Sequence, residues 1–99
     1  MKMDNSELSA LRRRMDRVNR QMLALFLERM DVVKRIGGLK KEAGIPVFDP
    51  GREEKTHRFV KENVPEDMEE YAQRLFSFLM HVSKEYQMKE RGEDDEGQA

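Results

Sequence analysis

Apolar side chains recur three and then four residues apart along the first half of the chain. The positions that share this pattern, called the seam below, are Leu8, Leu11, Met15, Val18, Met22, Leu25, Arg29, Val32, Ile36, Leu39 and Ala43. This spacing places all of them on one face of a helix. Asp4, Asn5 and Ser6 can cap its start, and Gly44 followed by Ile45 and Pro46 is a typical stop. The pattern predicts one helix over residues 6–43.

A helix of this length is too long to bury its apolar face within one small domain. It would extend about 55 Å at about 1.5 Å per residue, whereas a compact domain of 99 residues is about 33 Å across. We therefore predict that two copies pack along their seams as an intertwined homodimer. Gly37 and Gly38 interrupt the helix with two residues of low helix propensity, so a kink or a close helix approach is expected there.

Two shorter helices are predicted in the second half. After an extended connector over residues 45–48, Asp49 and Pro50 are a typical N-cap and first helical residue of a helix that runs to about Asn63. Pro65 and two acidic residues then open a third helix that runs to about Arg91. The apolar face expected for that helix is Met68, Ala72, Leu75, Leu79, Val82 and Tyr86. We predict an all-α fold of three helices per chain over residues 1–91, followed by a disordered acidic tail over residues 92–99.

Composition narrows the possible partners. Nineteen basic and twenty acidic residues nearly cancel, so no overall field attracts the chain to nucleic acid or to an anionic membrane. The sequence has no cysteine, and His57 and His81 lack ligand spacing, so no metal cofactor is expected. Residues 1–6 are polar, and no later segment is apolar over a membrane-spanning length. We expect a cytoplasmic protein.

Arg29 is the charged member of the seam, and a guanidinium there is costly unless an anion compensates it. A buried ion pair with Glu28, Asp31 or a carboxylate of a partner chain would satisfy it. A bound ligand would as well, because Lys40 returns to within about 20° of Arg29 and lies about 16 Å along the same face. Arg12 lies about 25 Å from Arg29 along the helix and could reach the same ligand only from another chain.

Polar residues elsewhere could complete a pocket. Asp49, Arg52 and Glu53 fall in one helical turn and offer a cation for a carboxylate and acceptors for a hydroxyl, although capping and surface ion pairs would also explain them. Ser83 and Gln87 are four residues apart and share a face of the third helix. They suit a pocket wall, or else are partly exposed polar positions.

Taken together, these positions resemble the all-alpha chorismate mutase family over residues 8–87. The stretches that carry the resemblance are Ala10-Leu11-Arg12, Glu28-Arg29, Gly37 to Lys40, Ile45-Pro46-Val47, Asp49, Arg52-Glu53 and Arg74-Leu75-Phe76 leading to Ser83 and Gln87. The resemblance implies an intertwined homodimer with shared active sites. It also implies the Claisen rearrangement of chorismate to prephenate, in phenylalanine and tyrosine biosynthesis, with no cofactor.

The resemblance also implies a role for each site residue. Arg29, together with Arg12 from the other chain, would contact the substrate carboxylates, with Arg52 and Ser83 as further contacts on that side. Lys40 and Gln87 would donate hydrogen bonds to the ether oxygen. Asp49 and Glu53 would lie near the ring hydroxyl.

Three alternatives remain open from the sequence. Isochorismate pyruvate lyase has the same fold and a cationic pocket, and Arg29-Met30-Asp31 with Val33-Lys34 resembles it in part. A mutase acting on 4-amino-4-deoxychorismate would differ in its contacts at the ring hydroxyl. A non-catalytic helical dimerisation module would need the seam alone, and it would give no reason for Arg29 and Lys40 to share a face.

Overall fold

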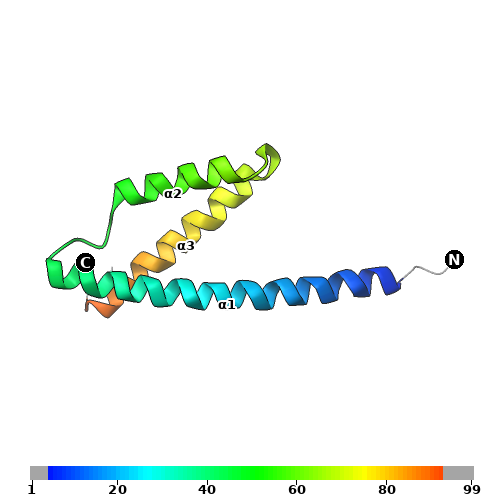
Figure 1. The fold of residues 1–99 in the computed structure, drawn as a ribbon, viewed down its shortest axis with the longest axis horizontal. Helices are drawn as coiled ribbons and strands as arrows, with labels where there is room; N and C mark the ends of the chain where they lie inside the picture. The colour runs from blue at the N-terminus through cyan, green and yellow to red at the C-terminus, as the bar shows by residue number, and fades with distance from the viewer. Residues whose placement is uncertain (1–4, 93–99) are drawn as a thin grey trace. The chain divides into compact units, whose positions relative to one another are not determined.

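Over the residues that the computed structural model describes, 5–92, every regular element is a helix. The elements are α1 (Asn5–Ala43), α2 (Pro50–Asn63), the 3-10 helix η1 (Glu66–Met68) and α3 (Glu69–Glu90), drawn in Figure 1. The all-α class and the three predicted helices are confirmed. The expected capping residue Asp4 and the acidic tail from residue 93 onward lie outside the described residues.

The end of α1 is fixed by Gly44, as the sequence predicted. Gly44 has φ +69°, a left-handed conformation that a residue without a Cβ adopts at low cost. Its N–H donates to the Lys41 carbonyl at 3.2 Å, and the Ile45 N–H donates to the Lys40 carbonyl at 2.8 Å. This pair of bonds is a Schellman motif, which satisfies two of the last carbonyls of the helix and turns the chain into the connector.

The start of α2 also follows its sequence signals. The Asp49 carboxylate accepts a hydrogen bond from the Arg52 N–H at 3.0 Å, and Pro50 occupies the first helical position. The third helix differs slightly from the prediction. Its first turn is η1, in which the Met68 N–H donates to the Pro65 carbonyl at 2.9 Å, and regular α-helix begins at Glu69.

The chain divides into two compact units, residues 1–32 and 33–99, which we describe separately. In the described part of the first unit, residues 5–32 form α1 up to Val32. The apolar seam side chains of this unit are between 41% exposed, at Val18, and 64% exposed, at Leu25. A single chain therefore leaves this helix face open to solvent.

The second unit contains the last turns of α1 together with α2, η1 and α3. Figure 1 shows α2 and α3 joined by a tight turn. His57 and Gln73 fasten the two helices together: their side chains are 2.7 Å apart, and the Gln73 amide also donates to the His57 carbonyl at 2.9 Å. Val60 of α2 is the most deeply buried apolar side chain described, at 2% exposed.

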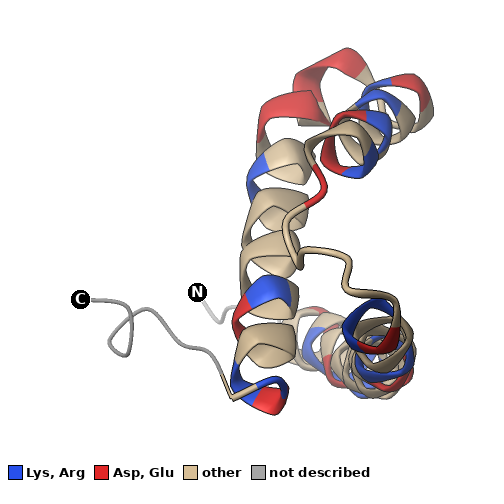
Figure 2. Cartoon of the chain, turned by 90° about the vertical axis from the view of Figure 1, so that its left-hand side faces the viewer, with Lys and Arg blue, Asp and Glu red and all other residues tan. Residues whose placement is uncertain are grey.

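The buried face of α3 agrees in part with the prediction, since Ala72, Leu79, Val82 and Tyr86 are partly buried. Met80 and Gln87 are each 8% exposed, whereas Met68 and Leu75 of the predicted apolar face are about half exposed, at 47% and 46%. The middle of α3 carries no charged residue between Arg74 and Lys84, which Figure 2 shows as a continuous tan stretch. Apolar residues occur on more than one face of this stretch of α3. Their spacing in the sequence therefore did not determine which of them are buried.

No described helix combines the length and the apolar character needed to cross a membrane.

Candidate active site

Gln87 is anchored on the backbone of α1. Its side chain is 8% exposed, and its amide nitrogen donates to the Val33 carbonyl at 2.8 Å. This bond determines which end of the amide faces α1, because a carbonyl accepts only from the nitrogen. The amide nitrogen carries two hydrogens, so a second donor remains for another acceptor.

Gly37 allows Gln87 to come this close. A Cβ at Gly37 would lie 3.0 Å from the Gln87 Cγ, whereas one at Gly38 would meet nothing within 4 Å. The close helix approach expected at this pair of glycines therefore occurs at Gly37, and α1 remains helical through both residues.

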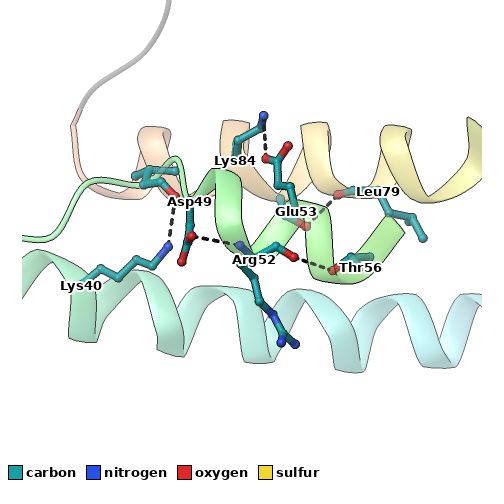
Figure 3. A network of polar contacts seen from close by, with 9 residues as sticks. Lys40, Asp49, Arg52, Glu53, Thr56, Leu79 and Lys84 are labelled. Atoms are coloured by element: carbon teal, nitrogen blue, oxygen red, sulfur yellow. Dashed lines mark hydrogen bonds and ion pairs between the residues drawn. The ribbon is translucent and has the colours of Figure 1, made fainter. Parts of the chain in front are cut away.

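Lys40 extends from α1 toward the connector. Its ammonium donates to the Val47 carbonyl at 3.0 Å in a partly buried position, as Figure 3 shows. An ammonium has three donors, so this bond orients Lys40 and leaves two N–H groups for a ligand.

Asp49 and Arg52 lie at the exposed start of α2. The capping interpretation of Asp49 is confirmed, since its carboxylate accepts from the Arg52 backbone N–H. In Figure 3 the Arg52 side chain is directed away from the carboxylates of Asp49 and Glu53. The Arg52 guanidinium therefore is not neutralised by its own helical turn, and its charge is available to an anion.

Glu53 has a partner that the sequence did not suggest. The Lys84 ammonium of α3 lies 2.9 Å from Glu53 Oε2, with the two side chains 32% and 25% exposed. The same ammonium lies 4.8 Å from the centre of the Phe48 ring. No local pattern identifies this pair, because 31 positions separate the two residues and only the packing of α2 against α3 brings them together.

Ser83 is partly buried, and its hydroxyl donates to the Leu79 carbonyl at 2.7 Å. It is adjacent in sequence to Lys84 and four residues before Gln87. The second unit thus contains six of the predicted site residues: Lys40, Asp49, Arg52, Glu53, Ser83 and Gln87.

Arg12 and Arg29 belong to the first unit. Arg12 is exposed, and Arg29 is half-buried. Burial lowers the pKa of the Arg29 guanidinium from its ordinary value, because desolvation disfavours the charged form. The same desolvation means that a nearby anion would stabilise Arg29 more strongly than it would a fully solvated arginine.

A hollow of about 460 Å³ lies beside the connector. Its lining residues are Gly44, Ile45, Pro46, Val47, Phe48, Lys84, Met88 and Arg91. None of the eight predicted site residues is among them. The hollow is therefore distinct from the predicted site, and Lys84 is on its border.

The chemistry available to the second unit is donation to oxygen and compensation of negative charge. Lys40 and Gln87 each retain hydrogen-bond donors, Arg52 supplies a cation, and the carboxylates of Asp49 and Glu53 can accept from a hydroxyl. Over residues 5–92, no group of three or more His, Asp or Glu side chains is arranged to hold a metal ion. His57 contacts Gln73, and His81 contacts Glu85.

Comparison with known proteins identifies the family of the chain. The family model "Chorismate mutase type II" matches residues 11–88. The chorismate mutase of Methanocaldococcus jannaschii is 29% identical over 86 residues, which is 82% of this chain and 84% of that protein.

Two longer relatives match about half of the chain. The bifunctional chorismate mutase/prephenate dehydratase of Aquifex aeolicus is 43% identical over 47 residues, and the T-protein of Enterobacter agglomerans is 38% identical over 48 residues. The match spans 48% of this chain and 13% of the length of each relative. Because the family model covers most of the helical region, this chain belongs to the chorismate mutase type II family, a family of isomerases.

Proposed function

We propose that this protein is a chorismate mutase, which converts chorismate to prephenate for phenylalanine and tyrosine biosynthesis. The observation that carries the proposal is the anchored amide of Gln87, which keeps one N–H bonded to Val33 and has a second N–H to offer. Membership in the chorismate mutase type II family supports the same assignment.

The reaction is a pericyclic rearrangement in which one C–O bond breaks as one C–C bond forms. It requires no proton transfer and no covalent bond to the protein. The enzyme has to hold the substrate in a compact reactive conformer and stabilise the negative charge that develops on the ether oxygen. In our proposal, Lys40 and Gln87 donate hydrogen bonds to that oxygen. Both side chains are already oriented by carbonyl groups of the protein, so little reorganisation accompanies the reaction.

The remaining site residues bind the rest of the substrate. Arg29 and Arg12 of the partner subunit hold the two carboxylates, and Arg52 and Ser83 support them. Asp49 and Glu53 lie at the ring hydroxyl. The half-buried position of Arg29 supports its role, because a partly desolvated guanidinium is stabilised by a nearby carboxylate more strongly than a fully solvated one.

The active form in this proposal is a homodimer with shared sites. Support comes from the seam, where Met15, Met22 and Leu25 are 59%, 51% and 64% exposed in the single chain. A continuous apolar face of this kind on a long helix is characteristic of helices that pair with another copy.

The test is to incubate the purified protein with chorismate and, separately, with isochorismate, and to identify the products. Prephenate from chorismate is the expected result. Salicylate and pyruvate from isochorismate would instead identify a lyase. Failure to convert either compound, in a protein that sediments as a dimer, would support a dimerisation module and contradict the proposal.

A further inference from the structure

Lys84 and Glu53 form an ion pair that differs from the surface pairs of the second unit. Its N–O distance is 2.9 Å, and its side chains are 32% and 25% exposed. For comparison, Lys34 and Glu90 also join two helices, but they lie 3.4 Å apart with side chains 60% and 46% exposed. The shorter and better shielded pair is the one that keeps a defined geometry and is less screened by solvent.

Phe48 fixes the position of the lysine further. The Lys84 ammonium lies over the Phe48 ring, 4.8 Å from its centre, which is within the range of a cation–π interaction. The ammonium is thus held by a carboxylate from α2 and by an aromatic ring from the connector. Figure 3 shows Lys84 reaching from α3 to Glu53.

The pair lies next to the residues that the proposed function uses. Lys84 directly follows Ser83 and precedes Gln87 by three residues, so Lys84 and Gln87 are neighbours on α3. Glu53 follows Arg52 in the first turn of α2. Because the Lys84 ammonium lies on Oε2 of Glu53, both lone pairs of Oε1 remain to accept a hydrogen bond from a ligand.

We propose that Lys84 is a positioning residue that determines specificity through Glu53. This inference rests on the proposed function, in which Glu53 lies at the ring hydroxyl. Lys84 orients the carboxylate so that its free oxygen accepts from a neutral hydroxyl. It also neutralises the carboxylate, so that a substrate with an ammonium group at the same ring position meets a second cation rather than an uncompensated anion. The site therefore selects a hydroxyl-bearing dicarboxylate over its amino analogue.

The test compares kcat and KM for chorismate and for 4-amino-4-deoxychorismate in the full-length protein. In Lys84→Met, which keeps most of the length of the side chain and removes its charge, KM for chorismate should rise by about tenfold. The preference for chorismate over the amino compound, measured as the ratio of the two kcat/KM values, should fall by about tenfold as well. Lys84→Arg should retain most of the preference, because it keeps the cation.

Two further variants separate positioning from a general loss of structure. In a Glu53→Gln background, Lys84→Met should change the substrate preference by less than about threefold, since the two residues act through one contact. Lys89→Met removes an exposed lysine from the same helix and should leave the preference unchanged. Circular dichroism and thermal unfolding identify any variant that fails to fold, and Lys84→Gln replaces Lys84→Met in that case.

The outcomes distinguish the inference from the function on which it rests. If the wild-type protein converts chorismate and Lys84→Met keeps the same KM and the same preference, the role of Lys84 is wrong and the mutase assignment stands. If Lys84→Met changes the substrate preference equally in the wild-type and Glu53→Gln backgrounds, the proposed role of Lys84 is also wrong. If the wild-type protein converts neither compound, the mutase assignment itself fails.

Discussion

The two units differ in how much of the proposed site one chain can organise. In the second unit, Gln87, Lys40 and Glu53 each have a specific partner at 2.8, 3.0 and 2.9 Å. In the first unit, Arg12 and Arg29 lie on a helix whose apolar seam residues are at least 41% exposed. The hydrogen-bond donors are therefore oriented by packing within the chain, whereas one chain leaves the apolar seam exposed.

The seam should be essential for assembly. Leu25→Asp places a charge at a seam position that is 64% exposed in the single chain, and we expect it to give a monomer without mutase activity, because the proposed sites are shared. Leu27→Asp is the matched control, since Leu27 is 61% exposed but lies off the seam. Analytical ultracentrifugation measures both. A dimeric Leu25→Asp protein would contradict the seam as the interface.

The anchored amide should determine the pH dependence of catalysis. In Gln87→Glu, a carboxylate would repel the negative charge that develops on the ether oxygen, so activity at neutral pH should fall by about 100- to 1000-fold. Activity should return as the pH falls and the introduced carboxyl becomes protonated, because the neutral acid can donate. The measurement is kcat against pH for both proteins. Profiles of the same shape would exclude the proposed role of Gln87.

The arginines of the first unit should act in different chains. Arg12→Ala and Arg29→Ala should each lower kcat/KM by about 100-fold or more, through loss of a substrate carboxylate contact. When the two proteins are mixed and their subunits exchange, about one quarter of the wild-type activity should return, since half of the dimers would be hybrids with one intact site. Native mass spectrometry confirms exchange. Hybrids without activity would argue against shared sites.

Gly37 and Gly38 should have opposite effects when replaced. Gly38→Ala meets nothing within 4 Å and should stabilise the protein by about 1 kcal/mol through higher helix propensity. Gly37→Ala places a Cβ 3.0 Å from the Gln87 Cγ, so the amide must shift, and kcat should fall by about tenfold. Chemical denaturation and steady-state kinetics test the pair. If both variants keep wild-type kcat, the close approach at Gly37 is not needed for catalysis.

Local signals in the sequence determined the element boundaries. The glycine after Ala43 and the Asp49-Pro50 pair set the end of α1 and the start of α2 as predicted, because capping depends on residues within one turn. The members of the proposed site also come from short stretches that resemble the family. The predicted start of the third helix was less accurate, because a 3-10 turn and an α-helix share the same capping signals.

Contacts between distant segments could not be predicted in this way. The sequence suggested a pocket wall at Gln87, but its bond to Val33 spans 54 positions. It assigned no role to Lys84, although this residue lies 2.9 Å from a predicted site residue. It also favoured Leu75 over Met80 as a buried residue of α3, because apolar residues surround this part of the helix and periodicity does not rank them.

By itself, the sequence determined the helices, their caps, the apolar seam and the family, because each depends on residue type and short-range spacing. The tertiary structure decided which hydrogen-bond donors are oriented and which groups of the protein orient them. Only the packing of α3 against the end of α1 gives Gln87 its carbonyl partner and leaves little room for a Cβ at Gly37, and only the packing of α2 against α3 pairs Glu53 with Lys84. The physical reason is that a hydrogen bond or an ion pair requires a distance near 3 Å, and the sequence does not specify the distance between side chains on different helices.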